Sequence, residues 1–254
     1  MIDGSSFALQ KGWQILLKDL GINPTNVLRR AGLPEDLFAR TSATISTAEY
    51  FNLLRGIEAE SGDRALPLKI GQTLSAEAFD PPIFAALCSP NWATAIRRLA
   101  RFKRLIGPMT LLVEENSEAT TVAIDCLDKS EPLPPCLIAL ELVFMVQLAR
   151  MGTREKAYPV RVVSTVPLEP MEDYKSYFGI AVCQGEKNAV AFARTDAVRP
   201  FLTVNDKMWQ FFEPELRQRL SEIETTATIS ERVRGILLEM LPSGRSSIRE
   251  VARI

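Results

Sequence analysis

One carboxylate stands alone in the most apolar segment of this chain. Glu141 lies in CLIALELVFMVQLA, residues 136–149, a run that is apolar on every side of a helical wheel. Because a buried carboxylate is costly unless it is paired, we expect Glu141 to face an arginine, a lysine or a polar group of a bound ligand. Ionisable groups in such surroundings collect at functional sites, so Glu141 is a candidate ligand-binding residue.

A strongly basic segment precedes it in the chain. Residues 91–106 contain four arginines, one lysine and no acid, and Arg97, Arg101 and Arg104 share one face of a helix. That face could bind the carboxylate of a ligand, a DNA-reading domain or a phosphate backbone, or it could be an ordinary solvated surface. We include Arg101 among the candidate ligand-binding residues.

Apolar side chains between residues 79 and 109 could line a pocket between the predicted sheet and the early helices. The candidates are Phe79, Phe84, Leu87, Phe102 and Met109. The sequence DPP at residues 80–82 would stiffen the loop beside them. Side chains of these types also suit a closely packed core, so the pattern leaves both a ligand pocket and plain packing open.

Several kinds of chemistry have no support in the sequence. The chain has no histidine, which excludes histidine-based triads and most zinc catalysis. It contains no GxSxG elbow, no phosphate-binding loop and no GxGxxG motif, and its four cysteines form no CxxC pair. We therefore expect no enzyme activity, no cofactor and no metal site, and we expect the cysteines to be reduced.

Composition and charge point to a soluble protein. Of the 254 residues 46% are hydrophobic and 24% are charged, and a net charge of −1 argues against a surface built wholly for polyanions. The N-terminus lacks the features of a signal peptide, and residues 136–149 are too few to cross a bilayer. We expect a cytoplasmic protein with no membrane partner.

Helix signals dominate the first hundred residues. Asn23 before Pro24 is an N-cap signal, and Ser46 with Glu49 forms a capping box. The helices predicted in this part of the chain cover residues 7–20, 24–31, 47–61, 66–76 and 91–106. Another helical pattern follows from residue 204 to residue 223.

Between these regions the apolar residues alternate as in strands. The strand-like runs are residues 109–113, 122–126, 158–166, 180–184 and 189–194. ENSE at residues 115–118 and GEKN at residues 185–188 predict hairpin turns. Strands in hairpins with helices outside them predict an α+β fold around an antiparallel sheet of about five strands.

The late helical segment carries an apolar stripe with two explanations. Met208, Phe212, Leu216 and Ile223 recur at helical spacing. The stripe could pair with its copy in a second subunit, or it could pack against its own domain.

Two capped segments end the sequence. Thr228 and Glu231 begin one predicted helix, LPSGR interrupts it, and Ser247 with Glu250 begins a second. A helix, a tight loop and a new helix start are how a helix-turn-helix opens.

The run VRGILLEMLPSGRSSIREVARI, residues 233–254, resembles the first helix and most of the second in the DNA-binding domain of AraC-type transcription regulators. DRALPLKIGQTL, FAALCSPNWATAIRRLARFKRLI and YKSYFGIAVCQGEKNAVAFARTDAVRPF are similar to the N-terminal arabinose-binding-like domain found in one branch of that family. The resemblance implies a domain for effector binding and dimerisation at residues 1–224. A linker and the opening of a DNA-binding domain would follow at residues 225–254.

The implied function is sensing of a small-molecule effector by a homodimer that regulates transcription. We expect DNA to be a partner of the full-length regulator and not of residues 1–254, which stop before any recognition helix. The alternative is a free-standing small-molecule-binding or scaffold domain without DNA binding, and an enzyme ranks third.

Overall fold

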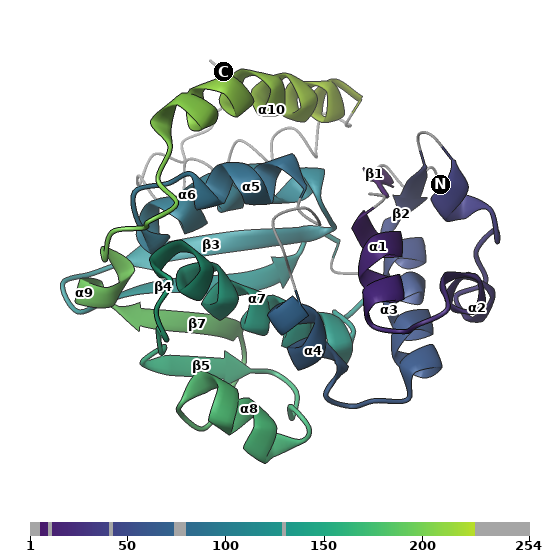
Figure 1. Cartoon of the computed structure of the whole chain (residues 1–254), viewed down its shortest axis with the longest axis horizontal. Coiled ribbons are helices and arrows are strands. Elements are labelled where there is room, and N and C mark those ends of the chain that lie inside the picture. Colours follow the sequence, from purple (N-terminus) through teal and green to yellow (C-terminus); the bar gives the residue numbers. More distant parts are fainter. Residues whose placement is uncertain (1–5, 10–11, 41–42, 74–79, 129–130, 227–254) are drawn as a thin grey trace.

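The computed structural model describes residues 6–9, 12–40, 43–73, 80–128 and 131–226. The predicted helix-turn-helix opening lies outside these residues. In the N-terminal part the elements are β1 (Ser6–Ala8), α1 (Gly12–Asp19), α2 (Pro24–Arg30), η1 (Leu37–Ala39), β2 (Thr44–Ser46), α3 (Thr47–Ser61) and α4 (Leu66–Thr73). They form a group of helices beside the sheet (Figure 1).

The remaining elements build the sheet and its cover. They are α5 (Pro81–Leu87), α6 (Trp92–Phe102), η3 (Lys103–Leu105), β3 (Met109–Glu115), β4 (Ala119–Cys126), α7 (Pro135–Thr153), β5 (Arg161–Ser164), α8 (Met171–Phe178), β6 (Cys183–Gln184), β7 (Asn188–Ala193), α9 (Arg194–Ala197) and α10 (Asp206–Thr226). Helices and a mainly antiparallel sheet together confirm the predicted α+β class.

The capping signals in the N-terminal part act as the sequence predicts. The Asn23 side chain accepts a hydrogen bond from the Thr25 amide at 2.9 Å. Ser46 and Glu49 close a capping box, in which the Ser46 amide donates to the Glu49 carboxylate at 2.7 Å. These bonds satisfy amides that a helix start would otherwise leave without a partner.

The helix predicted from Phe7 begins later than expected. Residues 6–8 form β1, which pairs antiparallel with β2, and α1 starts at Gly12. In this register Phe7 lies opposite Ile45, and both side chains are buried. Pairing with a distant strand therefore overrides the local helical pattern, which is a tertiary effect that a window of neighbouring residues cannot show.

The main sheet has five strands in the order β3-β4-β7-β5-β6. The β3–β4 hairpin at residues 115–118 is confirmed. The second predicted hairpin is wrong, because β6 pairs parallel with β5, with Val163 opposite Cys183, and does not pair with β7. The crossover through α8 brings the chain back in the direction of β5, which places the short β6 at the edge of the sheet.

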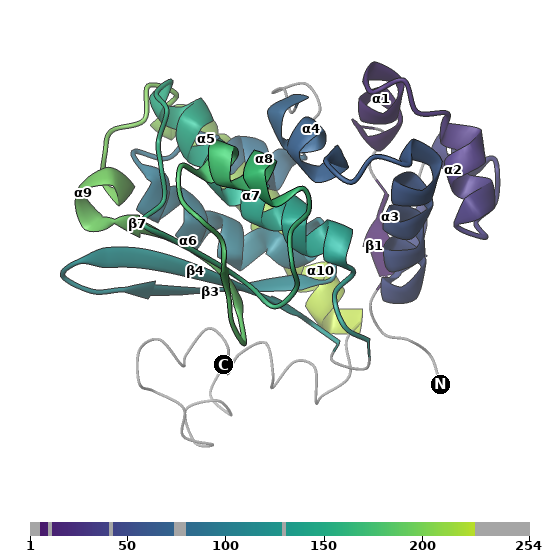
Figure 2. The ribbon, with the colours of Figure 1, turned by 90° about the horizontal axis from the view of Figure 1, so that it is seen from below.

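Helix α7 is the central element of the core. It lies along one face of the sheet, and Val122, Val190 and Val162 on that face share an apolar cluster with it (Figure 2). By length and composition α7 could cross a membrane, but 83% of its most apolar window is buried inside the fold. Helix α7 is apolar on all sides because other elements pack against it on all sides. Helix α4 packs so closely against it that a Cβ atom at Gly71 would collide with Val143.

Among the described residues, three apolar clusters make up the core. The largest lies between the sheet and helices α6 and α7, and the second joins the N-terminal helices to the start of α7. The third and smallest lies under α10, where Leu216 and Leu220 meet Ala85, Phe102 and Leu105. The candidate site lies where the first two clusters meet.

Candidate functional site

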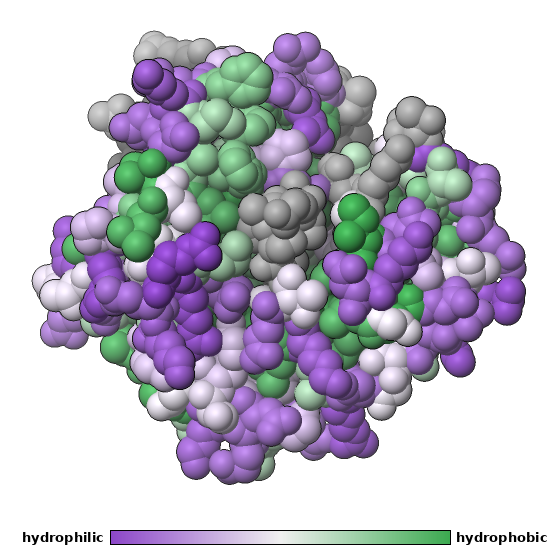
Figure 3. Space-filling view, viewed as in Figure 1, coloured by the Kyte–Doolittle hydropathy of each residue, from purple (hydrophilic) through white to green (hydrophobic). Residues whose placement is uncertain are grey.

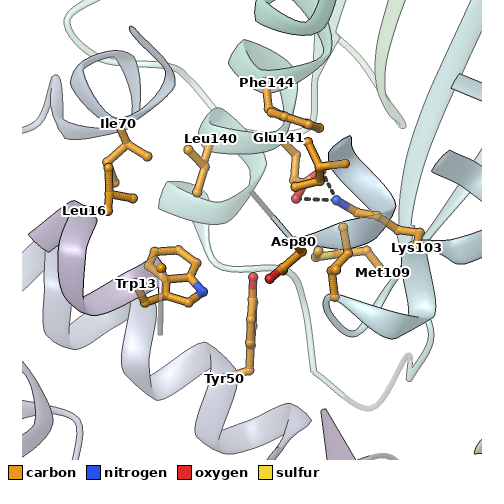
Figure 4. Close-up of a pocket in the computed structure, with 13 residues that line it drawn as sticks. Trp13, Leu16, Tyr50, Ile70, Asp80, Lys103, Met109, Leu140, Glu141 and Phe144 are labelled. Carbon is orange, nitrogen blue, oxygen red and sulfur yellow. Dashed lines mark hydrogen bonds and ion pairs between the residues drawn. The ribbon is translucent and has the colours of Figure 1, made fainter. Parts of the chain in front are cut away.

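A pocket opens between the N-terminal helices and α7 (Figure 4). Its empty volume is about 700 Å³, including the space at its mouth that is open to solvent. The lining residues are Gly12, Trp13 and Leu16 of α1, Tyr50 of α3, Ile70 of α4, Asp80 and Ile83 at α5, Lys103 of η3, Ile106, Met109 of β3, and Leu140, Glu141 and Phe144 of α7. Mainly apolar walls with a few polar groups among them are the character of sites that bind small organic molecules.

The pocket contains a buried ion pair. Lys103 Nζ lies 2.8 Å from Glu141 Oε1 and 2.7 Å from Oε2. The two side chains are only 3% and 8% exposed. This arrangement confirms the expectation that Glu141 has a basic partner. The positive ammonium group and the negative carboxylate offset one another, so the pair brings no net charge to the pocket.

Asp80 is the second carboxyl group in the pocket wall. It precedes α5, but its side chain makes no capping hydrogen bond. Burial raises the pKa of Asp80 to about 7, and this effect outweighs the opposing influence of the positive charges of Arg219 and Lys103. Near neutral pH, Asp80 is therefore divided between its neutral and ionised forms.

Tyr50 faces the same part of the pocket from α3. The hydroxyl of Tyr50 and the carboxyl of Asp80 point toward one another (Figure 4). Burial raises the pKa of Tyr50, and the nearby charges of Glu141 and Asp80 raise it further. Tyr50 is therefore a neutral hydroxyl that can donate or accept a hydrogen bond.

Two of the candidate ligand-binding residues line this pocket, namely Met109 and Glu141. Four others, Phe84, Leu87, Arg101 and Phe102, lie elsewhere. Phe84 and Phe102 face α10, with ring centroids 5.5 Å from Phe212 and 6.3 Å from Trp209, respectively. Leu87 belongs to the core between the sheet and its helices. Phe79 lies outside the described residues.

The basic face of α6 contacts protein groups. Arg97 donates to Glu115 at 2.8 Å, and Arg101 forms an ion pair with Glu213 of α10 at 3.9 Å. The Arg98 guanidinium lies 3.8 Å from the ring centroid of Trp209, also on α10. Two of these arginines therefore hold α10 against the domain, and Arg101 does not line the pocket.

The apolar stripe of α10 packs largely against its own domain. Leu216 is fully buried beside Phe102 and Leu105, and Phe212 and Ile223 pack against the same cluster. Met208 is half-buried. These contacts account for the apolar character of the stripe, and its role in a dimer interface stays a prediction.

Five polar or aromatic pocket residues were not identified from the sequence: Trp13, Tyr50, Asp80, Lys103 and Phe144. Trp13 and Tyr50 belong to apolar helix faces, and such faces give no local sign of a cavity. Lys103 offered a usable signal, because Glu141 required a basic partner and Lys103 lies in the basic segment. Across the described residues, no cluster of histidine, cysteine and acidic side chains could hold a metal ion.

Comparison with known proteins places the chain among transcription regulators. Residues 21–201, well over half of the chain, match the family described as the arabinose-binding domain of AraC transcription regulator, N-term. No curated protein matches. The fold is similar to the crystal structure of transcriptional regulator CdpR from Pseudomonas aeruginosa, with a TM-score of 0.57 and 16% identity over 96% of this chain and 75% of that chain. The chain therefore belongs to the family of N-terminal arabinose-binding domains of AraC transcription regulators.

Proposed function

We propose that this chain is the effector-sensing region of an AraC-type regulator and that a small molecule binds in the pocket between α1, α3 and α7. The observation that carries the proposal is a pocket with polar groups gathered in otherwise apolar walls. Most of its lining residues lie within residues 21–201, which match the family, and Gly12, Trp13 and Leu16 precede that range. Binding suits these groups, since the lysine and the glutamate neutralise one another and the remaining polar groups can hold a ligand by hydrogen bonds.

The pocket has two direct connections to α10. Asp80 lines the pocket and directly precedes α5, on which Phe84 contacts Phe212 of α10. Lys103 follows Phe102, whose ring faces Trp209 of α10. A ligand that moves the start of α5 or η3 would therefore change how α10 packs on the domain. Residues 227–254 follow α10 directly in the chain. Such a switch requires different ligand affinities in the two arrangements.

The regulator would work in the cytoplasm as a homodimer. A two-fold dimer suits paired DNA half-sites, and α10 is the element that we assign to the interface, through Met208 and the partly exposed Phe212 and Ile223. Leu216 is fully buried in its own domain and is left out of this interface. The side of α10 that faces solvent supports this assignment, because Phe211 is 69% exposed and adds to the apolar surface in that region (Figure 3). The DNA-binding domain would begin in residues 225–254.

A metabolite screen by thermal unfolding tests the binding site. Ile106→Trp places a large ring in the pocket, whereas Ile15→Trp adds the same ring on α1 at a position 50% exposed to solvent. A true effector should stabilise the parent and Ile15→Trp by about 2.7 kcal/mol at a hundredfold excess over its Kd, and it should leave Ile106→Trp unchanged. If Ile106→Trp responds as strongly as the parent, the ligand binds elsewhere and the proposed site is wrong.

A further inference from the structure

The polar groups of the pocket differ in whether they already have a charged partner within the protein. Lys103 is already paired, because its ammonium group donates to both oxygens of Glu141 and the two opposite charges neutralise one another. Asp80, by contrast, makes no side-chain capping bond and takes part in no ion pair within the described part of the chain. The pocket therefore presents one acidic group without a close basic partner.

Aromatic rings accompany this acid. Trp13 and Tyr50 line the same pocket, and Figure 4 shows both rings on the side of the cavity where Asp80 lies. The faces of such rings attract cations, and most strongly where water is excluded. The Tyr50 hydroxyl supplies a neutral hydrogen-bond acceptor beside the carboxyl group.

The rest of the wall is mostly aliphatic, apart from Met109 and the ring of Phe144. Leu16, Ile70, Ile83, Ile106 and Leu140 surround the remaining space. A polyhydroxylated molecule such as a sugar would leave most of its hydroxyl groups unpaired against these side chains, which is costly. A carboxylate ligand would meet the acid Asp80 and a lysine that is already neutralised, so it would also bind poorly.

We propose that the pocket takes a small molecule with a protonated primary amine joined to an apolar body, with the amine at Asp80, Tyr50 and Trp13 and the body against the aliphatic wall. This inference rests on the proposed effector site and names its ligand class. The amine would supply Asp80 with the positive partner that it lacks, and burial of the body would supply most of the affinity.

The charged and titratable groups that face Asp80 determine how ligand binding depends on pH. They are Tyr50 from α3, Lys103 from η3, Glu141 from α7 and Arg219 from α10. Of these Lys103 and Glu141 form a neutral pair, and burial keeps the Tyr50 hydroxyl protonated. Loss of the Asp80 charge below a pH of about 7 should therefore weaken amine binding, while a neutral ligand should be unaffected.

Calorimetric titration with a matched series tests the ligand class. The probes are 2-phenylethylamine, 2-phenylethanol and 3-phenylpropionate, together with hexylamine, hexanol and hexanoate. In each series the amine should bind the parent protein about tenfold or more tightly than the alcohol at pH 8, and the carboxylate should bind weakest. Lowering the pH to 6 should reduce the affinity for the amine alone.

Asp80→Asn should remove the preference for the amine and leave the affinity for the alcohol within about twofold, because the amide keeps the shape and loses the charge. The control Asp19→Asn removes an exposed acid of α1 and should change nothing. An alcohol or carboxylate that binds the parent as tightly as the amine would overturn the amine assignment, and so would an amine preference that survives Asp80→Asn. The site itself is judged separately by Ile106→Trp, which should abolish the binding of every ligand whatever its class.

Discussion

Lys103 and Glu141 are 38 residues apart in the chain, yet the lysine ammonium donates to both oxygens of the glutamate at 2.8 and 2.7 Å. The pair joins η3, which follows α6, to the middle of α7, and it borders the pocket. Loss of the pair should therefore affect both the stability of the fold and the shape of the proposed ligand site.

Breaking this pair from one side should be strongly destabilising. We expect Glu141→Gln or Lys103→Met to lower the free energy of unfolding by about 3–5 kcal/mol, because each leaves one buried polar group without its partner. The double variant Lys103→Met with Glu141→Leu should recover most of that loss, since no charge is then buried. Urea unfolding of Lys103→Met, the single variant Glu141→Leu and the double variant measures the coupling, and strictly additive losses would show that the two residues do not act as a pair.

The seating of α10 should depend on Leu216. Leu216→Ala removes a fully buried side chain and should lower the free energy of unfolding by about 2–5 kcal/mol. Leu202→Ala makes the same change at a side chain that is 74% exposed and should cost less than about 0.5 kcal/mol. Equal losses for the two variants in urea unfolding would contradict the packing of α10 on its own domain.

Asp80 should make the stability depend on pH. The pKa of its carboxyl group rises from 3.8 to about 7 on folding, so the unfolded chain loses this proton first as the pH increases. Asp80 therefore lowers the free energy of unfolding progressively between about pH 4 and pH 7, by at most about 1.4 kcal/mol per pH unit, and the loss is complete above pH 7. Asp80→Asn removes this term, so its stability relative to the parent should rise between pH 5 and pH 7 and then level off. A relative stability that stays constant over this range would show that burial does not perturb the group.

The proposed homodimer can be tested on the exposed side of α10. Phe211→Glu combined with Met208→Glu adds two charges to a surface that is exposed or half-buried in the single chain. In sedimentation velocity the parent should be a dimer and the variant a monomer, because a dimer would bury those charges. Unfolding of the variant at low protein concentration serves as the control for an intact fold. A dimer that persists would remove this surface from the interface.

The sequence predicts the fold well where the signal is local. The capping box at Ser46 and Glu49, the Asn23 cap and the alternation in residues 109–126 each depend on neighbouring residues. Prediction fails where pairing is distant. Strand β1 is three residues long and is defined only by its partner β2, and the parallel pairing of β6 depends on the crossover through α8.

The candidate site was less predictable for the same reason. Glu141 could be found because a single acid in an apolar helix needs a partner, whichever element supplies it. The sequence gives no comparable signal at Asp80 or Tyr50, because these residues come together only when α3, α5 and α7 pack around one cavity. Phe84 and Phe102 were candidates for the pocket wall, but they pack against α10 instead, which a local apolar pattern cannot show.

The central claim is that a ligand in the pocket changes how α10 packs on the domain. The most direct measurement is hydrogen exchange of the α10 amides, with and without a saturating ligand from the screen. The account predicts that exchange changes in α10 as well as in α1 and α3, and that the α10 change is kept in Ile15→Trp and lost in Ile106→Trp. Protection confined to α1 and α3, with the exchange of α10 unaltered, would contradict a sensing role for the pocket.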